Sequence, residues 1–189
     1  MHKGRLEAFS DGVIAIIITI MVLELKVPHG ARWDDLWPLW PVFLSYVLSF
    51  ANVGIYWNNH HHMLQTVRHV DGRILWANLH LLFWLSLMPF TTAWVGENHF
   101  ATLPMALYGA DLLLCALAYT LLQVCILAVP GNEVLGQAVG SDFKGKVSLF
   151  AYLAAIPLAF VHAALAGALY VGVALIWFLP DRRIEKVIA

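Results

Sequence analysis

Two aspartates and a run of histidines lie inside long apolar stretches of this 189-residue sequence. Asp11 follows Ser10 near the N-terminus, Asp111 lies in the second half of the chain, and His60–His62 end another stretch. Carboxylate and imidazole groups can carry protons, bind metal ions or form buried hydrogen-bonded networks. Because an ionisable group is costly in an apolar environment, each of these residues is a functional candidate.

The histidine run is a weak candidate for a metal site. Successive residues of a helix are turned by about 100°, so three adjacent imidazoles do not converge on one ion. No Cys, Asp or Glu lies at the spacing that a closed zinc site needs. We therefore expect no bound metal and no other cofactor, and we expect one or two of these groups to bond Asp11 or Arg5.

Common enzyme motifs are missing from the sequence. It has no Gly-x-Ser-x-Gly elbow, no glycine-rich phosphate loop and no His-Glu-x-x-His motif. We therefore expect that the protein is not an enzyme. The Thr-Val-Gly-Tyr-Gly potassium filter is absent too, so any ion pathway must be built differently.

The composition indicates the environment that holds these residues. Hydrophobic residues make up 61% of the chain and charged residues 12%, whereas soluble domains have about 45–50% and about 25%. With a mean hydropathy of +0.74, the sequence predicts an integral membrane protein in contact with the lipid bilayer. The net charge of −1 argues against a nucleic-acid partner, which calls for a basic surface.

Apolar stretches predict an all-α fold, a polytopic bundle of six membrane-spanning helices. Four stretches run from about Leu6 to Val27, Pro41 to His62, Ile74 to Val95 and Leu103 to Val129. The last stretch, Val147 to Leu179, would be about 50 Å long as one helix, too long for a core of about 30 Å. Pro157 and the Ala- and Gly-rich segment from His162 to Gly167 predict a tight turn between two short helices.

Lysine and arginine residues predict how the bundle is oriented. With six spans, nine of the 11 fall on the side of the termini and two on the other. Because basic loops stay in the cytoplasm, both termini are expected there. The nine are Lys3, Arg5, Arg68, Arg73, Lys144, Lys146, Arg182, Arg183 and Lys186, and the two are Lys26 and Arg32. We expect residues 1–189 to form a single transmembrane domain.

One face of the first predicted helix is apolar with a single hydroxyl in its deep part. At helical spacing this stripe consists of Phe9, Gly12, Ile16, Thr19, Ile20 and Leu23. In the simplest interpretation, Thr19 bonds the carbonyl one turn back and the apolar residues only pack. Helix geometry alone favours that interpretation over a functional role.

Asp11 needs a partner, because an unpaired carboxylate at this depth costs several kcal/mol. The inner ends of the first two spans lie at the same depth, so the second-span histidines are within reach of Asp11. Asn78 of the third span could join the same network. We therefore expect Asp11 to be a buried structural partner, whereas Asp111 lies nearer the opposite side without a partner that the sequence identifies.

The residues from position 5 to 12 read Arg-x-x-x-Phe-Ser-Asp-Gly, followed by Val-x-Ala-Ile-x-x-Thr-Ile. This run resembles the first-helix signature of the transmembrane protein 175 family of potassium channels. The Tyr-Trp-x-x-His-His run that begins at Tyr56 and the Leu-x-Pro-Phe run that begins at Leu87 resemble further family features. A single unit of this length is similar to the short prokaryotic form, whereas the animal members have two units in one chain.

The resemblance implies a homotetrameric potassium channel, weakly to moderately selective, in the cell membrane of a prokaryote. Its first helices would line a central pore, with hydrophobic gate layers and a threonine layer that potassium ions pass. These layers map onto Ile16, Thr19 and Leu23, with Ile20 on the same stripe. The role of holding the first helix in place maps onto Arg5, Ser10, Asp11, Trp57 and His60, and Phe9 and Gly12 complete the motif.

A different class of function uses the ionisable residues directly. A small secondary transporter or proton-coupled carrier would use Asp11, Asp111 and His60–His62 as coupling groups. The sequence shows no inverted repeat, which counts against this alternative.

Overall fold

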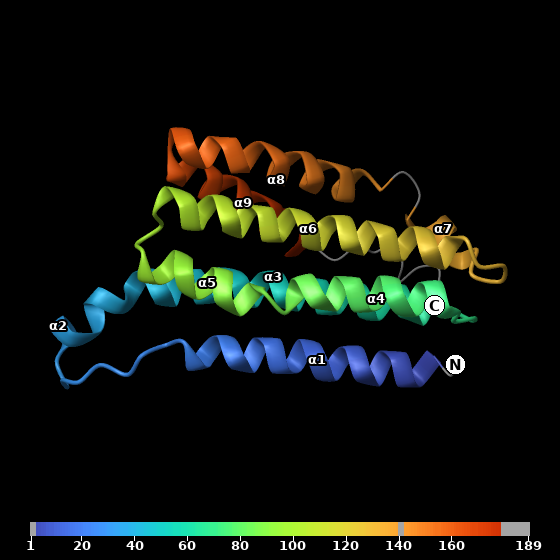
Figure 1. Cartoon of the computed structure of the whole chain (residues 1–189), viewed down its shortest axis with the longest axis horizontal. Coiled ribbons are helices and arrows are strands. Elements are labelled where there is room, and N and C mark those ends of the chain that lie inside the picture. Colours follow the sequence, from blue (N-terminus) through green and yellow to red (C-terminus); the bar gives the residue numbers. More distant parts are fainter. Residues whose placement is uncertain (1–2, 140–141, 179–189) are drawn as a thin grey trace.

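A computed structural model describes residues 3–139 and 142–178, and all regular structure within these ranges is helical. The long helices lie side by side in one elongated bundle (Figure 1). They are α1 (Lys3–Leu23), α3 (Trp40–Gln65), α4 (Gly72–Leu85), α5 (Met88–Glu97), α6 (Thr102–Leu127), α8 (Phe143–Val161) and α9 (Ala163–Phe178). Short helical turns are α2 (Trp33–Leu36), η1 (Trp37–Leu39) and α7 (Val134–Val139).

Five helical stretches are long and apolar enough to cross a membrane: α1, residues 33–65, residues 72–97, α6 and α8. The predicted all-α membrane bundle is thereby confirmed. The sixth predicted span corresponds to α9, a shorter apolar helix of 16 described residues. It would be about 24 Å long, somewhat less than the bilayer core of about 30 Å.

The predicted turn within the last apolar stretch is confirmed and lies at His162. This residue leaves the helical conformation, with φ −161° and ψ 116°, and separates α8 from α9. Pro157 lies inside α8 and does not end it. The predicted end of the stretch, Leu179, lies outside the described residues.

The third predicted span is not one helix but two, α4 and α5, which meet at Ser86 and Leu87. Pro89 occupies the first turn of α5. Because proline has no backbone N–H, it cannot bond the carbonyl four residues back, and its ring crowds that turn. The break therefore follows from the Leu-x-Pro-Phe sequence.

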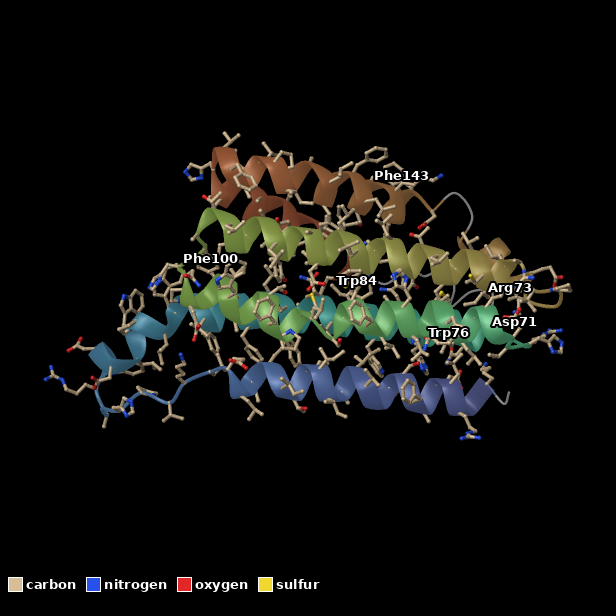
Figure 2. All side chains as sticks on the ribbon, viewed as in Figure 1. Asp71, Arg73, Trp76, Trp84, Phe100 and Phe143 are labelled. Carbon is tan, nitrogen blue, oxygen red and sulfur yellow. The ribbon has the colours of Figure 1, made fainter. Side chains whose placement is uncertain are left out.

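Basic residues gather at the end of the bundle where the described chain begins. Lys3 and Arg5 lie in the first turns of α1, and Lys144 lies near the start of α8. Arg73 and Asp71 lie at the start of α4 at the same end (Figure 2). Arg182, Arg183 and Lys186 lie outside the described residues. The side of the membrane that this end faces stays a prediction.

The core is centred on α6, which packs against α4, α5, α8 and α9. Leu112, Cys115, Ala118, Leu122 and Ile126 form its fully buried face at helical spacing. In contrast, α1 packs against α3, α4 and α5 and lies at the edge of the bundle (Figure 1). One side of α1 is therefore left uncovered.

Helices α3 and α5 approach each other closely at Gly96. A Cβ atom on Gly96 would lie 2.6 Å from the Cα atom of Val42 and 2.6 Å from the hydroxyl oxygen of Ser45. Only a residue without a side chain allows this contact between the two helices.

We expect Gly96→Ala to destabilise the protein by about 1–3 kcal/mol, because the backbone of α3 cannot move away without disturbing its neighbours. The measurement is the apparent melting temperature in detergent. The matched control is Gly54→Ala in α3, where a Cβ atom would meet nothing within 4 Å. Equal melting temperatures for the two variants would contradict the close-contact explanation.

Candidate functional site

The side of α1 that faces the bundle is defined by five buried residues at helical spacing: Leu6, Ser10, Ile14, Ile17 and Met21. They pack toward α3, α4 and α5. Four of the five are apolar, so packing alone does not distinguish this face from the other apolar faces of α1. Ser10 is the polar member.

The opposite side of α1 carries the stripe identified in the sequence. Ile16 is 58% exposed, Ile20 41% and Leu23 77%. Phe9 and Thr19 are exposed too, and a Cβ atom on Gly12 would meet nothing within 4 Å. The described part of the chain therefore leaves this apolar stripe largely uncovered along two-thirds of the helix.

Thr19 donates its hydroxyl hydrogen to the carbonyl oxygen of Ile16 at 2.9 Å. This is the local bond that the simplest interpretation of the sequence predicts. The bond uses the hydrogen of the hydroxyl and leaves the oxygen lone pairs free. Because Thr19 is exposed on the stripe, that oxygen remains available to a ligand outside the chain.

A buried chain of hydrogen bonds ties α1 to α3 and α4. The amide nitrogen of Asn78 donates to the hydroxyl oxygen of Ser10 at 2.9 Å. The amide oxygen of Asn78 bonds Nε2 of His60 at 2.7 Å, and the Ser10 hydroxyl donates to the carbonyl of Leu6 at 2.8 Å. Ser10, Asn78 and His60 are all buried. His60, rather than its two neighbours, is thus the histidine of the run that joins this network.

Asp11 forms a second attachment beside the first. Its carboxylate accepts a hydrogen bond of 3.0 Å from the indole N–H of Trp57. The Trp57 ring stacks on His61 with 6.0 Å between ring centroids, and His61 bonds the amide of Gln65 at 2.9 Å. The expectation that Asp11 is buried is wrong within one chain: Asp11 is half-buried, because it lies between the bundle-facing side and the open stripe.

Arg5 is placed differently from its motif partners. Its side chain is exposed, and among the described residues the ion pairs join Lys3 to Glu7, Lys26 to Glu97 and Arg32 to Asp34. Arg5 therefore has no carboxylate partner among the described residues of a single subunit.

The C-terminal end of α1 is attached through the segment that follows it. Lys26 donates a hydrogen bond of 2.5 Å to the carboxylate of Glu97 at the end of α5. This bond and the charge of Glu97 raise the pKa of Lys26. The attachment lies one turn beyond Leu23, so α1 is held at both ends.

Asp111 belongs to a separate polar network that the sequence did not reveal. Its carboxylate accepts a 3.0 Å hydrogen bond from the hydroxyl of Thr91. Next to it, Ser49 lies 3.0 Å from the hydroxyl oxygen of Tyr108 and accepts a 2.6 Å bond from Thr92. The sequence feature that could have indicated this network is the pair of adjacent threonines in α5, because both side chains are buried.

The coupling groups of the transporter alternative do not form one site. Asp111 contacts Thr91 and Cys115, whereas His60 contacts Asn78 and Asp11 contacts Trp57. Within residues 3–139 and 142–178, no group of three His, Cys, Asp or Glu side chains is placed to hold a metal ion.

Comparison with known proteins places the network inside a recognised family region. The family described as endosomal/lysosomal potassium channel TMEM175 matches residues 5–89. This region contains Ser10, His60 and Asn78, and it ends before Asp111.

Two relatives show how far the similarity extends. A protein of Chryseobacterium sp. (strain P1-3) named as a potassium channel is 58% identical over 98% of this chain and 97% of its own length. The endosomal/lysosomal proton channel TMEM175 of Homo sapiens is 30% identical over 92% of this chain, which spans 38% of that longer protein.

One solved structure is similar over nearly the whole chain. It is the crystal structure of a lysosomal potassium-selective channel TMEM175 homolog from Chamaesiphon minutus. The TM-score is 0.84 at 30% sequence identity, with 95% of this chain and 97% of that chain covered.

We expect Asn78→Leu to destabilise the protein by about 1–3 kcal/mol, because it leaves His60 buried without its hydrogen-bond partner. The readout is the apparent melting temperature in detergent. Asn58→Leu in α3 is the control, since the half-buried Asn58 makes no side-chain hydrogen bond within the described residues. If both variants melt together, the network does not hold α1.

Proposed function

This chain belongs to the family of the endosomal/lysosomal potassium channel TMEM175, and from that premise we propose that it is a potassium channel of four identical subunits. In each subunit α1 lines a central pore. The observation that carries the proposal is the uncovered stripe of α1, with Ile16 58% and Leu23 77% exposed. Four copies of the stripe around one axis would cover one another and enclose a narrow apolar path.

The proposed gate consists of apolar layers at Ile16 and Leu23, with Ile20 between them. An ion that enters such a layer loses hydration water and gains no oxygen ligand. A narrow apolar constriction is itself prone to dewetting, which blocks ions without any plug. The layers therefore act as barriers whose width sets the conductance.

Thr19 is the proposed source of selectivity. Its hydroxyl donates to the carbonyl of Ile16, so its lone pairs can face an ion on the axis. Four such oxygens would replace part of the hydration of potassium. Sodium holds its water more tightly and gains less from the exchange, which gives weak to moderate selectivity compared with a filter of carbonyl rings.

The polar residues of the motif have a structural role in this proposal. Ser10 and Asp11 hold α1 to α3 and α4 through Asn78, His60 and Trp57. They set the rotation of α1, and with it the direction of the stripe.

The exposed members of the motif complete this role. Arg5, Phe9 and Gly12 lie on the uncovered side of α1, so their partners come from a neighbouring subunit. We place the channel, one transmembrane domain of residues 1–189, in the cell membrane of a prokaryote with both termini in the cytoplasm, as the distribution of basic residues predicts.

Ile16→Asn is expected to raise potassium flux into liposomes about tenfold or more, which corresponds to lowering the barrier by about 1.4 kcal/mol. The reason is that amide dipoles replace an apolar layer in every subunit. The control is Leu153→Asn in α8, because Leu153 is 57% exposed, as Ile16 is, but lies outside α1.

The same preparation tests the assembly. Wild-type protein in detergent should have a protein mass near four copies of the chain. A monodisperse monomer that still carries flux, or well-folded Ile16→Asn protein with unchanged flux, would rule out the proposed pore.

Thr19→Val keeps the shape of the side chain and removes its oxygen. We expect the ratio of potassium to sodium flux to fall about two- to fivefold, if each oxygen ring contributes about 0.5–1 kcal/mol to the difference. Both ions are measured under the same gradient in liposomes. An unchanged ratio with normal expression would assign selectivity to another part of the pore.

A further inference from the structure

A small, partly open cavity lies on the other side of the bundle from the stripe of α1. Its volume is about 50 Å³, and residues of α3, α6, α8 and α9 line it. Its wall includes Asn52, Tyr56 and Asn59 of α3, Thr120 of α6, and Tyr152 of α8. The cavity extends from the inner end of the bundle, where Asp142 precedes α8, to the middle of α3.

Two phenol groups of the wall have no hydrogen-bond partner within the described residues: those of Tyr56 and Tyr152. Tyr152 is nevertheless only 3% exposed. Every fully enclosed side-chain nitrogen and oxygen of the described residues has a partner. The two phenol oxygens are therefore not sealed by protein atoms, and each must meet a space that admits a water molecule.

Other polar atoms of the wall can complete a hydrogen-bonded cluster. Asn59 donates its amide hydrogen to the carbonyl of Ile55 and keeps its amide oxygen as an acceptor. Thr120 donates to the carbonyl of Ala116 and keeps its lone pairs. An ordered water needs two to four polar partners, and the two phenol groups and these acceptors provide them.

We propose that this cavity is a hydration site that holds a cluster of about three to five water molecules inside each subunit. The number follows from the volume, since one buried water needs about 10–15 Å³ measured in this way. The waters bond the Tyr56 and Tyr152 hydroxyls and bring solvent from the inner end of the bundle to the depth of Asn52. This site is separate from the proposed pore and does not depend on it.

Water fits the cavity better than a lipid chain does. A hydrocarbon chain offers no hydrogen bond, so it would leave the phenol groups of the buried Tyr152 and the half-buried Tyr56 unpaired. Waters satisfy these groups at little entropic cost. At its deep end the cavity meets Asn52, which donates to the hydroxyl of Tyr108 at 3.3 Å, so the water cluster adjoins the polar network of Ser49 and Thr92.

The test is X-ray footprinting of the full-length protein in lipid nanodiscs, where hydroxyl radicals formed from bound water modify the side chains that contact it. Tyr152 should be modified at least tenfold faster than Tyr170. Tyr170 is the matched control, because it is equally buried but donates its hydroxyl to the carbonyl of Met105 at 2.9 Å. Equal, slow modification of both tyrosines would overturn the proposal.

Two variants of the wall connect the modification to the cavity. Ala116→Leu fills the space and should reduce modification of Tyr152 to the rate of Tyr170. Tyr56→Phe is the second variant, for use if Ala116→Leu does not fold. It keeps the packing and removes one hydrogen-bond partner of the water, so it should slow the modification of Tyr152. Unchanged modification in a folded variant would place the water elsewhere. Modification in detergent but not in nanodiscs would mean that lipid fills the cavity, which also overturns the proposal.

Discussion

The hydrogen-bonded chain from Ser10 through Asn78 to His60 is the constraint on which the arrangement of α1 depends. In a bilayer, the hydrophobic effect does not favour turning one apolar face of a helix toward the protein, because lipid tails are as apolar as the protein core. Buried polar groups determine which face of the helix turns toward the protein, since an unpaired amide or imidazole is costly in hydrocarbon. The bonds at Ser10 and Asp11 therefore set the rotation of the helix.

Once this rotation is set, the placement of the apolar stripe follows. Ser10 points into the bundle, so Ile16 and Leu23, at helical spacing on the other side, point away from it. The position of α1 at the edge of the bundle leaves that side uncovered. The ion pair of Lys26 and Glu97 holds the C-terminal end of α1, so the stripe lies on a helix that is fixed at two points. In the proposed tetramer these two attachments determine how far each apolar layer lies from the axis.

The other half of the bundle uses polar groups in a different way. Around α6, Asp111 and Tyr108 bond hydroxyl groups of α3 and α5, and the proposed water cluster joins this region to the inner end. Here the polar groups bond one another between α3, α5 and α6, and none of these bonds involves a residue of the stripe. The subunit thus divides into a scaffold and an attached helix that it orients.

Hydropathy and charge in the sequence were sufficient to predict the membrane bundle, the turn at the end of α8 and the stripe of α1. These features depend on local composition and helical periodicity, which any apolar helix in a bilayer obeys. The Leu-x-Pro-Phe run contained the break between α4 and α5, but the hydropathy pattern concealed it because both helices are apolar.

The partners of the polar residues were decided only by the tertiary structure. The sequence favoured the adjacent histidines as partners of Asp11, and this prediction was wrong: His60 bonds Asn78, and Trp57 bonds Asp11. In the structure Arg5 is also exposed, and Asp111 accepts a hydrogen bond from Thr91. Each outcome depends on how two helices are rotated and shifted against each other. That relation joins residues distant in the chain, so no local pattern in a single sequence contains it.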